Sequence, residues 1–166
     1  MIKIQNILVA TDFSETSDSA LNYGRTLALT FGAHLHVLHV VENSLLWTGL
    51  EGYAYDFALV QEGIEEAARK KLAALVGPDN GQPPRTTTVV KAGTSPAFVI
   101  ADYGKAAKID LIVMGTHGRG TVGHLLIGSV AERVVRIAPC PVLTLRSPEH
   151  EFVLPDALEA VAAVRR

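Results

Sequence analysis

A glycine-rich segment, residues 115–130 (GTHGRGTVGHLLIGSV), contains the residue types that proteins use to bind phosphate groups. A glycine such as Gly118 lets the main chain approach a ligand where a side chain would collide with it. We expect a helix to begin at Ser129, and the free N–H groups at a helix start attract anions. The Ser129 hydroxyl can donate a further hydrogen bond, and Arg119 and His117 would add positive charge. The segment therefore predicts a phosphate site, with an ordinary flexible loop as the alternative.

Two known phosphate-binding motifs compete for this segment. The Walker pattern requires Gly-Lys-Ser or Gly-Lys-Thr, and neither occurs in the chain. The dinucleotide pattern G-x-G-x-x-G occurs at residues 118–123, but it follows the fourth predicted strand instead of the first. Leu143 stands about 20 positions later, where that motif needs an acidic residue to hold a ribose. We interpret the dinucleotide match as a coincidence within a different loop.

An acidic residue, Asp12, stands where the first apolar run of the chain ends. A carboxylate at the carboxyl end of a buried strand can accept hydrogen bonds from the hydroxyl groups of a ribose. The alternative is a turn or helix-capping role, because Ser14 follows as a plausible N-cap residue. Asp12 is therefore a candidate ribose ligand whose capping role stays open.

These candidate residues must be positioned by the elements around them, and short apolar runs alternate with helical patterns along the chain. The predicted strands are residues 2–10, 34–41, 85–91, 109–114 and 141–146. The predicted helices are residues 14–31, 61–76, 95–107 and 129–137. This alternation implies an α/β fold, a doubly wound parallel sheet with helices on both faces. In such a sheet, ligands bind beyond the carboxyl ends of the strands, where the winding reverses.

Two segments are not explained by this alternation. Residues 42–57 (ENSLLWTGLEGYAYDF) form a long aromatic loop, which we expect to be a lid or to pack on the core or on a partner subunit. Residues 147–166 form a C-terminal tail with a short amphipathic helix near residues 155–165. That helix is too short to be stable alone, so we expect it to dock. The predicted organisation is one domain, residues 1–146, followed by this tail.

The composition excludes several classes of protein. The chain has 166 residues, of which 48% are hydrophobic and 19% charged, and this favours one compact domain over disorder. With 15 basic and 17 acidic residues the net charge is −2, so the chain lacks the basic excess that binds nucleic acid. No run approaches the ~20 apolar residues of a membrane span, and no signal-peptide pattern is present. We expect a cytoplasmic protein with no nucleic-acid or membrane partner.

Histidine and cysteine residues do not form a recognisable metal or catalytic motif. His34 and His36 share one face of a predicted strand while His39 faces the other side, so we expect them at a sheet edge or an interface. Cys140, the single cysteine, lies between two prolines as a packed or partly exposed thiol. No serine-nucleophile elbow, catalytic base or carboxylate pair for magnesium stands out near the glycine-rich segment. We therefore predict residues that bind a ligand, and we predict neither a metal site nor catalytic residues.

Four separated motifs resemble those of the universal stress protein family. Gly115, two residues, Gly118, nine residues and then Gly128-Ser129 match the family's G-2x-G-9x-G-S signature. Residues 10–14 (ATDFS) are similar to the family's apolar-x-Asp-x-Ser start. The remaining similarities are residues 39–41 (HVV) at the end of the second strand and residues 138–143 (APCPVL) at the last strand. The resemblance covers about residues 1–146.

The resemblance implies a Rossmann-like sheet of five parallel strands in the order 3-2-1-4-5, and a homodimer formed through residues 142–146. It also implies ATP binding, because the subclass with an intact glycine signature binds ATP, and Mg²⁺ would be held through the phosphates. The residues implied for adenine and ribose are Ala10, Thr11, Asp12, Val41, Met114 and Gly115. The residues implied for the phosphates are Gly118, Gly128, Ser129 and Val130, beside His117 and Arg119.

The leading hypothesis is a nucleotide-dependent stress-response sensor or regulator with little or no turnover. Bound nucleotide would change the surface shown to an unknown downstream protein partner. One alternative is a slow ATPase on the same site, and another is a structural dimer that binds no nucleotide. A dinucleotide oxidoreductase is the most distant alternative, and preferential binding of NAD over ATP would favour it.

Overall fold

The computed structural model describes residues 3–42, 54–77, 84–116 and 127–146, and these form five strands and four helices in alternation. The strands are β1 (Asn6–Ala10), β2 (His34–Glu42), β3 (Thr86–Gly93), β4 (Leu111–Gly115) and β5 (Val142–Leu145). The helices are α1 (Glu15–Phe31), α2 (Ala54–Val76), α3 (Pro96–Ala106) and α4 (Ser129–Ile137). All strands pair in parallel in the order β3-β2-β1-β4-β5, which confirms the predicted doubly wound fold and strand order.

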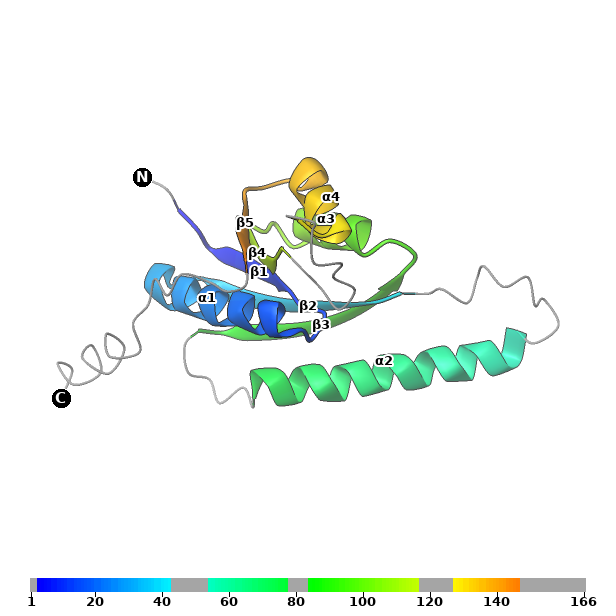
Figure 1. Cartoon of the computed structure of the whole chain (residues 1–166). Helices are drawn as coiled ribbons and strands as arrows, with labels where there is room; N and C mark the ends of the chain where they lie inside the picture. Colours follow the sequence, from blue (N-terminus) through cyan, green and yellow to red (C-terminus); the bar gives the residue numbers. More distant parts are fainter. Residues whose placement is uncertain (1–2, 43–53, 78–83, 117–126, 147–166) are drawn as a thin grey trace.

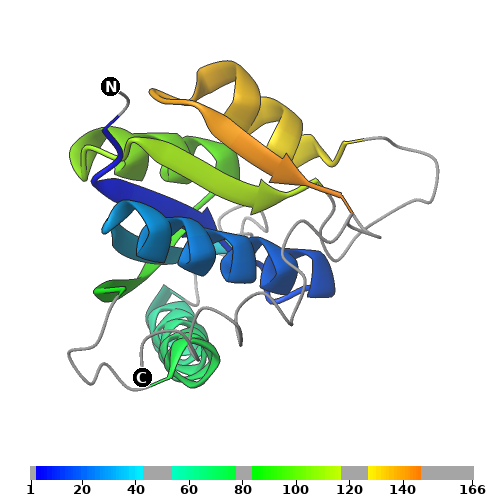
Figure 2. The same ribbon diagram turned by 90° about the vertical axis from the view of Figure 1, so that its left-hand side faces the viewer.

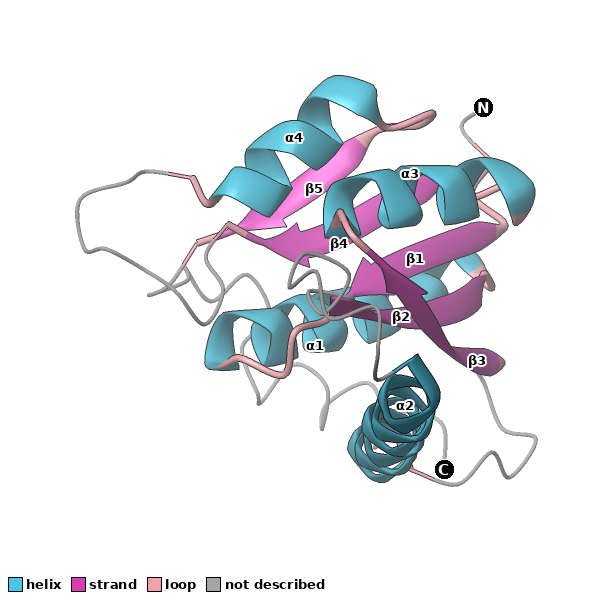
Figure 3. Cartoon of the chain, turned by 90° about the vertical axis from the view of Figure 1, so that its right-hand side faces the viewer, coloured by secondary structure: helices cyan, strands magenta, loops and turns pink. Residues whose placement is uncertain are grey.

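Helices cover both faces of this sheet (Figure 1). The side chains of β1 alternate between two cores: Ile7 and Val9 lie in the core beneath α1 and α2, while Leu8 and Ala10 lie in the core beneath α3 and α4. Figure 3 shows α3 and α4 on one side of the strands and α1 on the other. Because both faces of β1 are buried, the strand is apolar at successive positions instead of alternating with polar residues.

Local signals in the sequence set several helix boundaries as predicted. Ser14 is the N-cap of α1, and its side chain accepts a hydrogen bond from the N–H of Ser17. Gly32 ends α1 with φ +63°, in the left-handed region that glycine adopts without strain. Pro96 begins α3 after Ser95, as expected for a residue without an N–H group.

The prediction for the second helix was wrong at its start, because α2 begins at Ala54 and not at Gln61. Residues 54–57 are therefore helical and do not belong to the expected loop. No proline interrupts the segment, but Leu59 and Val60 are both exposed, which hides the amphipathic pattern that marks a helix. Residues 43–53 of the expected loop, and the tail at residues 147–166, lie outside the described residues.

Strand ends differ from the predictions mostly by one or two residues, but β1 begins at Asn6 instead of at residue 2. The N–H groups of Gln5 and Asn6 donate to the Asp110 carboxylate at 2.7 and 2.9 Å. A side chain from the turn before β4 thus binds the amides at which the ladder of β1 begins.

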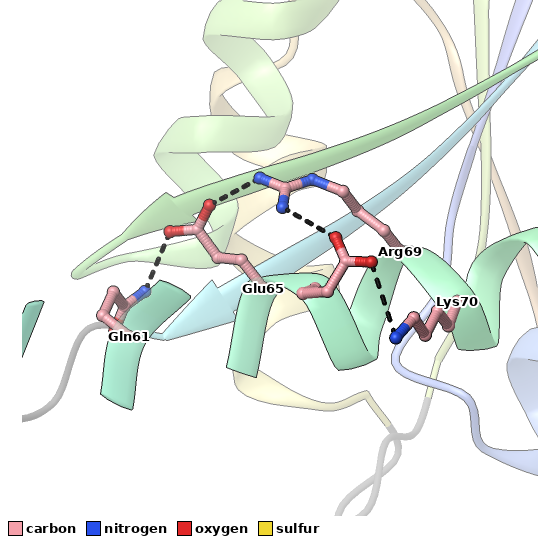
Figure 4. A network of polar contacts seen from close by, with 5 residues as sticks. Gln61, Glu65, Arg69 and Lys70 are labelled. Carbon is pink, nitrogen blue, oxygen red and sulfur yellow. Dashed lines mark hydrogen bonds and ion pairs between the residues drawn. The ribbon is translucent and has the colours of Figure 1, made fainter. Parts of the chain in front are cut away.

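Charges lie along the surface of α2 and at its C-terminal end. The exposed ion pairs are Glu65–Arg69 at 3.0 Å, Glu66–Arg69 at 3.5 Å and Glu66–Lys70 at 3.7 Å (Figure 4). The last turn of α2 has no basic residue of its own, and Arg25 of α1 donates to the carbonyls of Leu75 and Val76 at 3.1 and 3.0 Å. Arg25 therefore supplies the positive charge that a helix C-terminus favours. None of the helices in the described parts of the chain is long and apolar enough to cross a membrane.

Candidate functional site

The carboxyl ends of β1 and β4 lie side by side where the winding of the sheet reverses (Figure 2). Ala10 of β1 pairs in register with Met114 of β4, and both side chains are buried. The chain leaves β1 through Thr11 and Asp12 toward α1, and it leaves β4 after Gly115. The structure thus brings these five predicted site residues to the crevice at which doubly wound sheets bind ligands.

The turn after β1 is held by its own polar side chains. Asp12 Oδ1 accepts hydrogen bonds from the N–H and the hydroxyl of Ser14, at 3.1 and 2.6 Å. The Ser17 hydroxyl donates to the Ser14 carbonyl, so the buried Thr11 hydroxyl donates to Ser17 Oγ at 2.9 Å. Thr11 Oγ1 also accepts from the N–H of Phe13 at 3.0 Å. Asp12 therefore has the turn-forming role, which was the alternative to its predicted role as a ribose ligand. The Thr11 hydroxyl makes its hydrogen bonds within the same turn.

Two residues that the sequence did not single out for the site, Phe13 and His39, support this turn. His39 Nδ1 lies 2.8 Å from the Thr11 carbonyl oxygen, and because a carbonyl only accepts, Nδ1 carries the proton and donates it. The Phe13 and His39 rings pack with their centroids 4.3 Å apart. Phe13 has φ +63°, which is unusual for a residue with a side chain. The sequence signals were that His39 faces away from His34 and His36, and that both residues lie in segments that resemble the family's motifs.

The start of α4 is fixed to the end of β4, because the Gly128 N–H donates to the Thr116 carbonyl. Gly128 is the N-cap of α4 and, within the described residues, no side chain caps this helix, whereas Ser14 caps α1. Such a helix start presents N–H groups to an anion. The exposed Ser129 and the half-buried Val130 lie in this first turn, as predicted. The other predicted phosphate ligands, His117, Gly118 and Arg119, lie outside the described residues.

Val41 lies further along the same edge of the sheet. Ala10 pairs with Leu38, and the Thr11 N–H donates to the Leu38 carbonyl at 2.9 Å. Val41 follows Leu38 by three positions, which is about 10 Å along a strand. Its side chain is 6% exposed and lies on β2 where that strand extends past β1. Val41 therefore borders the crevice at a distance from Ala10.

The other strand histidines lie in the first half of β2 and serve its packing. Since β2 lies between β3 and β1, the expected position at a sheet edge was wrong. His34 Nε2 bonds the Thr87 hydroxyl at 2.9 Å, and His36 Nδ1 bonds the Tyr103 hydroxyl at 2.8 Å. Burial, and secondarily the charge of His34, lowers the pKa of His36 to about 4, so this ring is neutral at pH 7. In the described parts of the chain, no group of three or more His, Cys, Asp or Glu residues is arranged to hold a metal ion.

Comparison with known proteins confirms the resemblance over the range of the described residues. Residues 3–146 match the model of the universal stress protein family. The chain is 35% identical over 142 residues to a universal stress protein of Thermus aquaticus, covering 86% of this chain and 98% of the relative. It is 32% identical over 147 residues to one of Methanocaldococcus jannaschii, covering 89% and 85%.

Solved structures share the fold. The universal stress protein UspA from Lactobacillus plantarum has a TM-score of 0.71 at 26% identity, covering 88% of this chain and all of that one, 100%. A universal stress protein in complex with cAMP has a TM-score of 0.55 at 23% identity, covering 87% and 98%. One from Archaeoglobus fulgidus in complex with dAMP has a TM-score of 0.58 at 20% identity, with the same coverage of 87% and 98%. The chain belongs to the universal stress protein family.

Proposed function

We propose that this protein binds an adenine nucleotide at the carboxyl ends of β1 and β4. The hydrogen bond from Gly128 to Thr116 carries the proposal, because it places a helix start with a glycine cap beside the crevice where the winding reverses. The nucleotides named for two proteins of the same fold, cAMP and dAMP, support an adenine ligand. The preferred ligand in this proposal is ATP, with Mg²⁺ held through the phosphates.

The residues proposed to bind the nucleotide form two groups at the carboxyl ends of the strands. Adenine and ribose are assigned to Ala10, Thr11, Asp12, Val41, Met114 and Gly115, and the phosphates to His117, Gly118, Arg119, Gly128, Ser129 and Val130. At the described phosphate end the donors are main-chain N–H groups and one serine hydroxyl, which suit an anion and bind it without a covalent step. This donor set supports binding and orientation of phosphates. The proposed role is accordingly that of a stress-response regulator with little or no turnover, which signals to a protein partner.

The test is calorimetric titration of nucleotide-stripped protein with Mg-ATP. We expect binding at about micromolar strength, roughly −8 kcal/mol. Ser129→Ala should weaken binding about ten- to a hundredfold, because a hydrogen bond to a charged group contributes about 1.5–3 kcal/mol. Ser95→Ala is the control, since Ser95 also lies at the start of a helix, as the N-cap of α3, and its side chain makes no capping hydrogen bond there. Gly118→Val should abolish binding if the glycine-rich segment contacts the phosphates.

Each alternative has its own outcome in the same samples. No heat and no thermal shift for the unsubstituted protein would favour a structural dimer that binds no nucleotide. Steady release of phosphate, lost in Gly118→Val, would favour a slow ATPase on the same site. Equal affinity of Ser129→Ala and Ser95→Ala would remove the start of α4 from the proposed site.

We also propose that the protein forms a homodimer through residues 142–146. The sheet order places β5 at one edge, where its outer backbone groups are available to a second chain. Such pairing would leave the crevice between β1 and β4, which lies on the inner side of β4, to the nucleotide.

A further inference from the structure

Phe13 takes an unfavourable backbone conformation directly beside the proposed ribose ligand Asp12. Its φ of +63° lies in the left-handed region, where a side chain crowds the following carbonyl. A residue with a large side chain persists in such a conformation only where its surroundings hold it there. The contacts of the Phe13 ring therefore decide whether the turn keeps this shape.

The Phe13 ring is held by residues from two other elements. The His39 ring of β2 packs against it with centroids 4.3 Å apart. Lys71 Nζ of α2 lies 4.4 Å from the ring centroid, within the range of a cation–π contact. An open surface pocket of about 240 Å³, lined by Phe13, Asp18, Lys71 and Leu75, lies beside this contact. Lys71 thus connects α2 with the turn that contains Phe13.

The His39 ring also fixes the main chain of the turn. Its Nδ1–H donates to the Thr11 carbonyl at 2.8 Å, just before Asp12 and Phe13. One imidazole therefore positions the backbone at Thr11 and packs against the ring at Phe13. Phe13 therefore contacts both this imidazole and Lys71 on α2.

We propose that Phe13, His39 and Lys71 are positioning residues that hold the Thr11–Asp12 turn in its nucleotide-binding shape and couple nucleotide binding to the position of α2. This inference rests on the proposed nucleotide site. It extends that proposal by naming α2, through Lys71, as the element whose position changes when nucleotide binds. A nucleotide that stabilises the turn also stabilises the contact between Phe13 and Lys71. Because coupling between two sites is reciprocal, a partner that displaces α2 weakens nucleotide binding.

Variants of His39 separate its two contacts. His39→Phe keeps a ring against Phe13 but removes the donor to Thr11, while His39→Asn keeps a donor at the position of Nδ1 and removes the ring. We expect both variants to weaken Mg-ATP binding, His39→Phe about five- to tenfold through the lost donor and His39→Asn about two- to fivefold through the lost ring contact. Urea unfolding of each variant shows whether it is folded, and a merely structural role would change unfolding without changing ATP affinity.

Variants of Lys71 test the coupling with a matched control on the same helix. Lys71→Met should weaken Mg-ATP binding about two- to fivefold, the effect of an exposed cation–π contact. Lys70→Met, which alters only the exposed pair with Glu66, should leave affinity unchanged. Hydrogen exchange should show that ATP protects amides of α2 around Lys71 in the unsubstituted protein and not in Lys71→Met.

The outcomes separate this inference from the proposed function. ATP binding by the unsubstituted protein with unchanged affinity in folded His39→Phe and in Lys71→Met would overturn the inference alone. The same loss in Lys70→Met as in Lys71→Met would also overturn it. No ATP binding by the unsubstituted protein would overturn the proposed function and the inference together.

Discussion

His36 is a buried side chain whose protonation makes the stability of this fold depend on pH. The residue is 9% exposed, its Nδ1 bonds the Tyr103 hydroxyl, and its ring lies 4.3 Å from that of His34. Its Nε2 has no hydrogen-bond partner among the described residues, so the charged ring, which carries a proton on both nitrogens, would bury an Nε2–H without an acceptor. Burial and the neighbouring His34 accordingly lower the pKa of His36 from 6.5 to about 4.

We expect His36 to destabilise the fold in acid. The unfolded chain takes up a proton near pH 6.5 whereas the folded chain resists it until about pH 4. The stability that depends on a neutral His36 is therefore complete above pH 6.5 and is lost as the pH falls toward 4, by at most about 3 kcal/mol. Urea unfolding at pH 7 and pH 4.5 measures this loss, and His36→Asn, which keeps a partner for Tyr103, should lose about 2 kcal/mol less. The same loss in both proteins would show that His36 titrates normally.

At the residue scale, the sequence predicts those roles of a residue that depend only on the residues next to it in the chain. Ser14 caps α1 and Gly128 precedes α4 as expected, because both roles depend on the next few residues. The supporting role of His39 depends on a contact with Thr11, which is distant in sequence and meets it only when β2 pairs beside β1. Its contact with Phe13 depends further on a left-handed φ that the residue type disfavours. Periodicity carries no information on either.

At the scale of elements, α1 approaches β1 closely because Gly24 has no side chain. A Cβ added at Gly24 would overlap the side chain of Val9. Glycine within a helix is unfavourable for the isolated element, so its presence here reflects packing. The type and order of the elements were predictable because the strands of a parallel sheet are apolar on both faces. The early start of α2 was not predictable, because its exposed Leu59 and Val60 break the amphipathic pattern of a helix.

We expect Gly24→Ala and Gly63→Ala to change stability in opposite directions, although both improve helix propensity. Gly24→Ala should destabilise by about 1–3 kcal/mol, because the methyl group overfills the α1–β1 contact. Gly63→Ala in α2 is the control, since nothing lies within 4 Å of its added Cβ, and it should stabilise by up to about 1 kcal/mol. Urea unfolding of both variants checks the pair. Stabilisation by both would mean that α1 can move away from β1 at little cost.

At the scale of the whole molecule, the sheet has two edges, β3 and β5, and the edge at β5 is short. The carbonyls of Pro141 and Leu145 accept hydrogen bonds from Ile112 and Thr116 around β4. Because backbone groups alternate in direction along a strand, those of Val142 and Thr144 point outward, away from β4. This row of outward groups is what a second copy of the chain would pair with in the proposed dimer.

We expect Thr144→Pro to abolish the proposed dimer while leaving the fold intact. Proline removes an outward N–H group and spares the ladder with β4, so the edge loses a donor to its partner and the sheet does not. Thr144→Val keeps the N–H group and is the control. Sedimentation at micromolar concentration should show dimers for the unsubstituted protein and Thr144→Val, and monomers for Thr144→Pro. A dimer that survives in Thr144→Pro would place the interface elsewhere.

The bond between Gly128 and Thr116 makes the stretch of chain between them replaceable. The hydrogen bond joins the two ends of this stretch, so we expect the sheet and α4 to tolerate changes in the number of residues between them. The entropy of closing a flexible connection rises by only about 0.6 kcal/mol for each doubling of its length. We therefore expect that inserts of other lengths and compositions can be grafted between Thr116 and Gly128 without refolding the scaffold.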